Sequence, residues 1–301
     1  MAVPKLMSAL AVLLSIACCE RLYKDISSRN HGSICWNTDL LHCPSLNPQR
    51  CLENPESYPR GRILGGSESQ QFRPYMVSLQ VEGKHSCGGL LISDEWVLSA
   101  AHCKPESINT TLQAVLGIKS LSDSKKLVYD IETQVIHPEY NTSNKHHDLL
   151  LLKLPEKVPL SESISPLRYQ TEDIMIKENT LCMVAGWGKI KKTGKKPYVL
   201  HEVLVPVISL EVCNRRDYYH GEVTVNIICA GDNKRDSCEG DSGGPLICNE
   251  VVEAIVSSGF TVCGNLRRPG KYTRIAPYKN WIVETIRNFT KPTIPIPTVK
   301  I

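Results

Sequence analysis

From residue 63 onward, short runs of β-branched and aliphatic residues alternate with stretches rich in Gly, Pro, Asn and Asp. Many short apolar runs separated by turn residues predict the strands of a β-barrel or β-sandwich. In chain order the runs are Met76–Val81, Leu90–Leu98, Leu112–Leu116, Val128–Val135, Leu149–Leu154, Leu181–Trp187, Val203–Ile208, Pro245–Ile247 and Val251–Ser257. The pattern therefore predicts an all-β fold.

The C-terminal part of the chain has a different pattern. Between Tyr278 and Asn288 the larger and apolar side chains recur at helical spacing, which predicts an amphipathic helix. These side chains are Trp281, Ile282, Thr285 and Ile286. Residues 291–301 contain three prolines and are predicted to form a flexible tail.

The N-terminal segment resembles an export signal. Lys5 precedes an apolar run of 12 residues, Leu6 to Ala17, and small residues at 15, 17 and 19 suit a cleavage point. A membrane-spanning helix needs about 20 apolar residues, so the run is too short for a permanent span. We therefore predict a signal peptide over residues 1–19, an irregular leader over 20–62 and a folded domain over 63–290. The protein is expected to be secreted, with no membrane association.

The composition argues against several classes of protein. Hydrophobic residues make up 42% of the 301 residues and charged residues 22%, which argues against disorder. The formal charge of +4 is too small to indicate nucleic-acid binding. Export makes disulfides the default interpretation of the 13 cysteines, and no paired Cys-x-x-Cys spacing favours zinc instead.

The segment Gly240-Asp241-Ser242-Gly243-Gly244-Pro245 suits a nucleophile. A serine hydroxyl needs a base to take its proton and a backbone that leaves it exposed. Flanking glycines let the chain turn tightly and let two N–H groups converge on a developing oxyanion. An ordinary Gly/Ser turn is the competing interpretation, and the full six-residue pattern disfavours it.

Two further segments supply a candidate base and its orienting carboxylate. His102, in Ser99-Ala100-Ala101-His102-Cys103, follows a strand-like run and can accept the serine proton. Asp148 opens a run of four leucines, where a carboxylate at the edge of a buried strand can orient an imidazole. Alone, these would be interpreted as a core histidine and a surface aspartate. His146 and His147 adjoin Asp148 and are interpreted as exposed loop residues.

His102, Asp148 and Ser242 occur in the chain order of the chymotrypsin-like serine proteases, which this chain resembles from about Arg62 to Ile286. The resemblance implies two six-stranded antiparallel β-barrels, followed by a C-terminal helix, with the triad between the barrels. It also implies that the backbone N–H groups of Gly240 and Ser242 form the oxyanion hole. No cofactor and no catalytic metal are implied.

Arg62-Ile63-Leu64-Gly65-Gly66 resembles the activation junction of that family. The resemblance implies that another protease cleaves after Arg62 and frees the α-amino group of Ile63. That ammonium would pair with Asp241, because a buried carboxylate requires a partner. A surface loop that is never processed is the alternative.

The resemblance also implies a cysteine pairing. The implied bridges are Cys87–Cys103, Cys182–Cys248, Cys213–Cys229 and Cys238–Cys263. Cys35, Cys43 and Cys51 remain, so at least one is unpaired, intermolecular, or paired with Cys18 or Cys19.

The primary specificity pocket is implied in the same way. Asp236 occupies the position at the base of the pocket, which favours Arg or Lys before the scissile bond. Ser257 and Gly259 would bind the substrate backbone, and Gly259 and Gly270 would keep the pocket open. Digestive relatives have a tryptophan between the residues that match Ser257 and Gly259, where this chain has Ser258. Losing that apolar wall, together with five lysines between positions 189 and 196, predicts restricted specificity for one protein partner.

Within the family, the resemblance is greatest to complement factor D, which cleaves complement factor B bound to the activated third complement component. It rests on residues 59–66, 73–76, 213–216, 235–238, 258–259 and 263–265. Factor D has a self-inhibited resting site that uses an arginine, and the matching position here is Thr261. A granzyme of the tryptase type, stored in lymphocyte granules, is the alternative, and an inactive binding homologue is the third.

Three Asn-x-Ser/Thr sequons suit a secreted glycoprotein. They begin at Asn109, Asn141 and Asn288. The expected partners are a factor B-like protein substrate and the activating protease, and the enzyme itself is expected to be a monomer.

Overall fold

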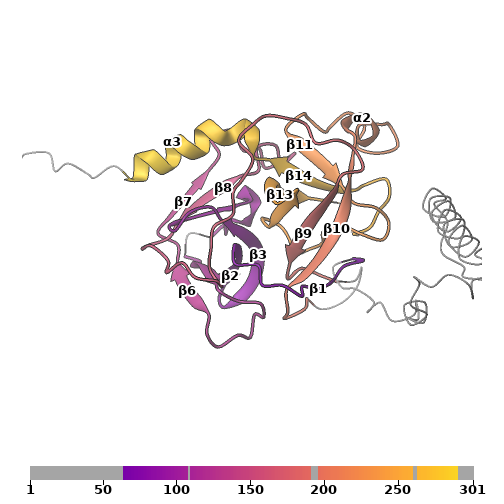
Figure 1. Ribbon diagram of the computed structural model, residues 1–301. Helices are drawn as coiled ribbons and strands as arrows, with labels where there is room; N and C mark the ends of the chain where they lie inside the picture. Colours follow the sequence, from indigo (N-terminus) through magenta and orange to yellow (C-terminus); the bar gives the residue numbers. More distant parts are fainter. Residues whose placement is uncertain (1–63, 108, 191–195, 260–262, 291–301) are drawn as a thin grey trace, which may run out of the picture. The chain divides into compact units, whose positions relative to one another are not determined.

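The computed structural model describes residues 64–290, apart from residue 108 and the segments 191–195 and 260–262 (Figure 1). All of them belong to one compact unit, Pro59–Ile301. Several predictions lie outside the described residues. They concern the signal peptide 1–19, the leader 20–62 (which contains Arg62, Cys35, Cys43 and Cys51), the new N-terminus at Ile63, Thr261, and the tail 291–301.

The first half of the domain is a curled antiparallel sheet of seven strands. They run in the order β6-β5-β2-β3-β4-β8-β7. Their bounds are β2 Met76–Val81, β3 Lys84–Leu91, β4 Trp96–Ser99, β5 Leu112–Leu116, β6 Leu127–Asp130, β7 Thr133–Ile136 and β8 Leu150–Lys153. The 3₁₀ helix η2 (Ala101–Cys103) follows β4.

The second half is a barrel in which β9 pairs with β10 to close the circle β10-β11-β14-β13-β12-β9. The two-residue strand β1 (Ser67–Glu68) adds to the outside of β10. The strands are β9 Leu181–Gly186, β10 His201–Ile208, β11 Ile227–Ala230, β12 Pro245–Cys248, β13 Val251–Ser258 and β14 Gly270–Arg274. The short helices α2 (Leu210–Cys213) and η3 (Ala276–Tyr278) and the helix α3 (Lys279–Thr290) complete the domain. The predicted all-β, two-barrel fold with a C-terminal helix is confirmed.

The strands differ from the sequence prediction in several places. The run Leu90–Leu98 divides into β3 and β4 at a turn, and Val128–Val135 divides into β6 and β7. β11 has only four residues, and β14 has a polar sequence, so neither was predicted. β14 is buried although polar, because Arg274 pairs with Asp173 at 2.6 Å.

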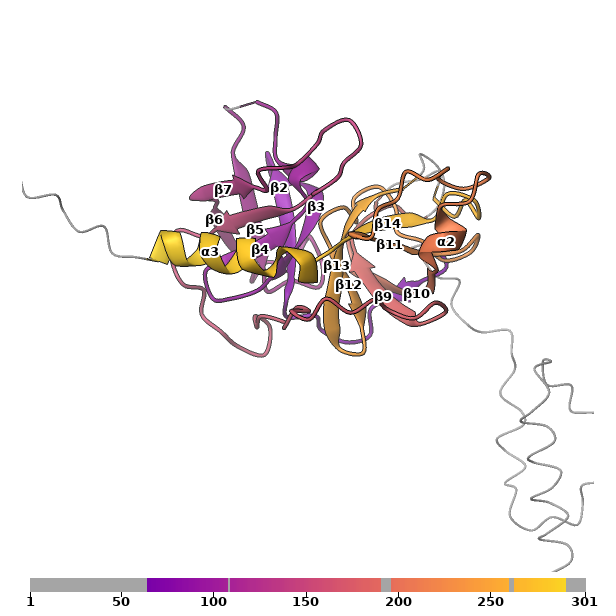
Figure 2. The same ribbon diagram turned by 90° about the horizontal axis from the view of Figure 1, so that it is seen from above.

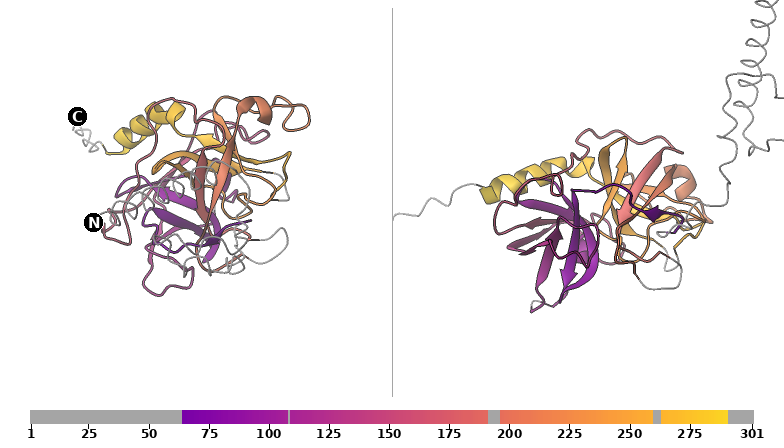
Figure 3. Two further views of the ribbon diagram at one scale, coloured as in Figure 1. Left: turned by 45° about the vertical axis from the view of Figure 1, so that its right-hand side comes forward. Right: turned by 60° about the horizontal axis from the view of Figure 1, so that its bottom comes forward.

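The helix α3 lies along the first half of the domain, as Figures 2 and 3 show. Its Ile282 is completely buried, and Phe289 meets Trp96 of β4 edge to face, with ring centroids 5.8 Å apart. The same apolar core continues into the second half through Trp187, Val252 and Ile255. A shared core fixes the relative position of the two halves, which is what a site built from both requires.

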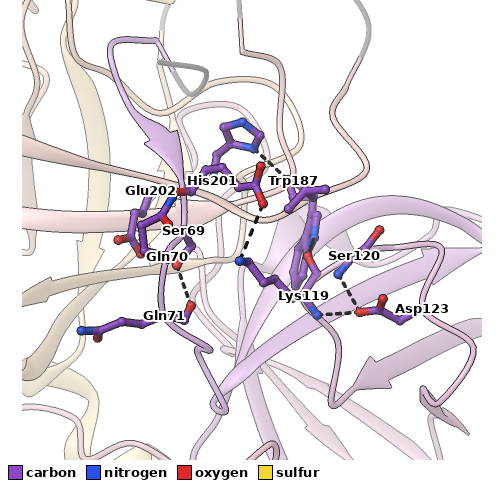
Figure 4. Close-up of polar contacts among 11 residues, drawn as sticks. Ser69, Gln70, Gln71, Lys119, Ser120, Asp123, Trp187, His201 and Glu202 are labelled. Carbon is purple, nitrogen blue, oxygen red and sulfur yellow. Dashed lines mark hydrogen bonds and ion pairs between the residues drawn. The ribbon is translucent and has the colours of Figure 1, made fainter. Parts of the chain in front are cut away.

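Polar contacts also join the halves (Figure 4). The indole N–H of Trp187 donates to the carbonyl of Lys119 over 3.2 Å, and the Lys119 ammonium lies 3.6 Å from Glu68. Asp123 accepts from the backbone N–H groups of Lys119 and Ser120 and so shapes the turn that makes these contacts. The turn after β5 therefore anchors the first half to the second.

Candidate active site

His102 and Asp148 meet because of the pairing between β4 and β8. Ser99 lies opposite Leu150, so the residues just beyond that end of each strand come together. Nδ1 of His102 lies 2.7 Å from Oδ2 of Asp148, and the His102 backbone N–H donates to Oδ1 over 3.0 Å. The Ser257 hydroxyl also donates to Asp148, over 2.6 Å. The fully buried carboxylate therefore fixes the imidazole ring with Nδ1 as donor and leaves Nε2 available as a base.

Ser242 lies on a tight loop of the second half that presses against β3. The Gly88 N–H donates to the Ser242 carbonyl over 2.7 Å. Gly243 has φ +80°, and a Cβ there would lie 2.2 Å from the hydroxyl of Ser99. Only glycine fits this approach. Ser242 and His102 line one cavity of about 500 Å³.

The N–H groups of Gly240 and Ser242 have no hydrogen-bond acceptor among the described residues. Gly240 has φ +102°, a conformation that favours glycine. Two such donors beside a partly exposed serine can hold an anion.

Behind this loop lies a histidine that sequence reasoning missed. One ring nitrogen of His85, Nε2, lies 2.9 Å from the Gly240 carbonyl, and Nδ1 lies 2.8 Å from the Ser78 hydroxyl. Burial lowers the pKa of His85 to about 4, so the ring is neutral. Nε2–H then donates to the carbonyl and Nδ1 accepts from Ser78. The turn at Glu82-Gly83 is the signal that could have placed Ser78 and His85 on neighbouring strands, β2 and β3.

Asp241, next to the nucleophile, is fully buried. It accepts from the N–H groups of Gly188 and Cys238, each over 2.8 Å. A Cβ at Gly188 would lie 2.5 Å from this carboxylate, so a side chain there would exclude it. Burial raises the pKa of Asp241 to about 6, and the two N–H groups oppose that shift. The charged form therefore still gains from a cationic partner.

The residues that follow the expected activation junction lie against the same half. Leu64 forms a bridge with Asp236, whose N–H donates to the Leu64 carbonyl over 3.2 Å. The Leu64 side chain packs on Gly264, where a Cβ would lie 2.1 Å from it. The segment beginning at Leu64 is therefore part of the wall around Asp236.

A second cavity, of about 280 Å³, opens beside Ser242. Its lining includes Ser237, Ser242, Val256, Ser257, Ser258 and Gly259, and the Cys238–Cys263 disulfide joins its walls. Gly259 and Gly270 face each other, since a Cβ on Gly259 would lie 3.8 Å from the Gly270 Cα. A Cβ on Gly270 would approach Asp236 and Ser237 to 3.0 Å. Gly259 and Ser237 line the cavity, whereas Gly270 and Asp236 lie behind this lining, so access of a substrate side chain to Asp236 stays a prediction.

Asp236 is buried and incompletely satisfied. Oδ2 accepts from the Gly264 N–H over 2.7 Å, whereas Oδ1 has no hydrogen-bond partner among the described residues. Burial raises the pKa of this carboxyl to about 7. A buried, unpartnered carboxylate oxygen creates a demand for a cation or a donor.

The rim of this cavity carries charge. Lys145 and Lys189 line it, and the Lys189 ammonium pairs with Glu239 at 2.5 Å. Lys196 lines the neighbouring cavity with His102. The other lysines of the expected basic loop lie within the segment 191–195, outside the described residues.

The four disulfides implied by the resemblance are present: Cys87–Cys103, Cys182–Cys248, Cys213–Cys229 and Cys238–Cys263. The first ties η2, which carries His102, to β3. Asn109, Asn141 and Asn288 are all exposed, as modification would require, and their glycosylation stays a prediction.

Comparisons with known proteins agree with this geometry. Residues 63–282 match the model of the trypsin family. Granzyme M of Homo sapiens is 37% identical over 227 residues, which cover 73% of this chain and 88% of granzyme M.

Proposed function

Because the chain belongs to the trypsin family, and is therefore a serine endopeptidase with protein substrates, we propose that it cleaves after Arg or Lys with restricted specificity. The observation that carries this proposal is Asp236, a buried carboxylate with one unpartnered oxygen that directly precedes Ser237 in the cavity wall. A guanidinium or ammonium group entering the cavity would supply the missing partner.

Catalysis is proposed to use His102, Asp148 and Ser242. Asp148 holds the imidazole, so its Nε2 takes the Ser242 proton as the hydroxyl attacks the scissile carbonyl. The resulting imidazolium is stabilised by Asp148 and then protonates the leaving amine. The N–H groups of Gly240 and Ser242 receive the oxyanion, and His85 positions the Gly240 peptide through its carbonyl.

The proposed restricted specificity rests on the end of β13, where Ser258 and Gly259 line the cavity. Ser258 stands beside Gly259 at the cavity, where a bulky indole would add an apolar wall. Without that wall, short peptides gain little binding energy, and orientation must come from an extended protein surface.

We expect Asp236→Ser to lower kcat/KM for substrates with arginine before the scissile bond by roughly 10²–10⁴-fold, the cost of removing one member of a buried ion pair. A cleavage-site profile of processed wild-type enzyme and of the variant measures this change. Asp217→Asn, which alters an exposed aspartate, is the control. An unchanged preference for arginine in the Asp236 variant would refute the proposed specificity.

Activation is proposed to require cleavage after Arg62. The new Ile63 ammonium would reach Asp241, since Leu64 already lies in the wall beside the loop of Asp236 and Asp241. The ion pair would favour the ionised carboxylate and order the Gly240 peptide.

Arg62→Gln should leave the chain at its precursor level of activity after treatment with an Arg-directed activating protease. Arg60→Gln, two residues upstream, should still be activated and is the matched control. N-terminal sequencing combined with rate measurement checks both variants. A fully active Arg62→Gln chain that begins upstream of Ile63 would exclude the switch.

Two biological settings have separate support. The segments shared with complement factor D favour cleavage of a factor B-like protein bound to the activated third complement component. The identity with granzyme M favours a granzyme-type protease. Incubation with purified factor B, with and without its cofactor, separates them, because only the first setting predicts cofactor-dependent cleavage.

Secretion is proposed from the N-terminal signal pattern. Among the described residues, no helix combines the length and apolarity needed to cross a bilayer. Disulfides and exposed sequons both suit the secretory route.

A further inference from the structure

A cluster of three potential metal ligands lies outside the proposed catalytic machinery. His137 directly follows β7, Glu139 lies two residues further on, and His147 directly precedes Asp148. One ligand atom from each of the three lies within 4.8 Å of the others. The other such group among the described residues, Cys87, His102 and Cys103, has its two sulfurs in a disulfide.

The backbone holds the two histidines side by side. The His137 N–H donates to the Leu149 carbonyl over 3.0 Å, and the Leu149 N–H donates to the His147 carbonyl over 2.8 Å. These bonds join the segment after β7 to the segment before β8. The two strands are paired neighbours, as Figure 1 shows.

Aromatic residues fix the two rings. His137 is 7% exposed and stacks on His147, with centroids 5.4 Å apart and planes 12° apart. Tyr278 and Trp281 meet the His137 ring edge to face, at 5.0 and 4.9 Å. The Tyr278 hydroxyl lies 3.1 Å from Nδ1 of His147. These contacts hold both imidazole rings in fixed orientations.

The donor set favours zinc. Two imidazole nitrogens and a carboxylate oxygen are zinc ligands, whereas Ca²⁺ and Mg²⁺ require mostly oxygen. Tetrahedral coordination needs donor atoms about 3.3 Å apart, so the cluster must contract. Glu139, whose side chain is 72% exposed, and His147, whose side chain is 28% exposed, have room to move, while His137 is held. His147 is thus half-buried and not the exposed loop residue expected from sequence.

The cluster is coupled to the catalytic site through one peptide bond. His147 has φ +57°, a left-handed conformation that is uncommon for histidine. Its neighbour Asp148 makes the two contacts that orient His102. Drawing His147 towards a metal changes the peptide that places Asp148.

We propose that His137, Glu139 and His147 bind Zn²⁺ with water as the fourth ligand, and that binding lowers protease activity by displacing Asp148. The binding part stands on the cluster alone, and the inhibitory part rests on the proposed function.

The first experiment measures zinc binding to the full chain by titration with ZnCl₂, without any activity. His147→Asn should lose one site or weaken it by at least about 10-fold, and so should Glu139→Gln. Asparagine tolerates the left-handed conformation, and Glu139 is exposed, so both variants should fold. His146→Asn, the adjacent histidine, is the matched control and should bind like wild type. Equal binding by all four proteins would overturn the proposal.

The second experiment titrates ZnCl₂ against amidolytic activity after activation. Wild type and His146→Asn should be inhibited and should recover when a chelator is added. His147→Asn should lose at least about 10-fold in sensitivity. Equal inhibition of all variants would place the inhibitory zinc elsewhere and would overturn the coupling. Failure of the proposed protease function would remove activity from every protein and leave the binding result unchanged.

Discussion

Ser242→Ala is expected to reduce kcat by about 10⁶-fold, because the nucleophile and its base act as a unit and loss of either removes covalent catalysis. The same variant should lose all covalent labelling by an organophosphonate carrying a guanidino group. Rates on an arginine substrate and mass spectrometry of the labelled chain measure the two effects.

The control is Ser122→Ala, which alters an exposed serine outside both cavities and should label like wild type. Retention of labelling in Ser242→Ala would place the nucleophile at another residue. Failure of the correctly processed wild type to label would favour an inactive binding homologue.

Asp148→Asn should lower kcat by about 10⁴-fold while leaving the backbone in place. The carboxylate accepts from Nδ1 and from the backbone N–H of His102, and from Ser257, so its charge selects the ring tautomer. An amide can donate to Nδ1 instead, which moves the proton to Nε2 and removes the base.

Kinetics over a pH range, together with the melting temperature, test this prediction. Asp94→Asn, which alters a partner of the exposed Lys157, is the matched control and should keep full activity. A loss of less than about 10-fold in the Asp148 variant would contradict the assigned role.

Much of this fold could be predicted because its strands are short, apolar and separated by turn residues. The limits are physical. The strand β14 carries Arg274, which can be buried because it pairs with Asp173 and donates to the carbonyls of Val225 and Ile174, and Asp173 lies 101 positions away. The turn that divides Leu90–Leu98 contains the polar residues Ser93, Asp94 and Glu95, but Ile92 before them and Trp96 after them still pack in the core, so the stretch resembles one continuous strand.

The parts of the candidate site that could be predicted are those whose residues are adjacent in the sequence. Ser242 and its glycines form one local pattern, and the family resemblance adds His102 and Asp148. Contacts across the domain were not predictable from composition or spacing. The bond from His85 to the Gly240 carbonyl spans 155 positions, and the stacking of His137 on His147 depends on the register of two strands.

The bond from Gly88 to the Ser242 carbonyl is one of several contacts that hold the two halves of the domain together at the candidate active site. His102 lies on one barrel and Ser242 on the other, and where the two meet a Cβ on Gly88 would lie only 3.1 Å from Gly244. A small separation of the two barrels would move His102 away from Ser242 and stop turnover, although the strands of each barrel would still be folded. Loss of turnover on heating is therefore expected at or below the temperature at which the strands themselves unfold.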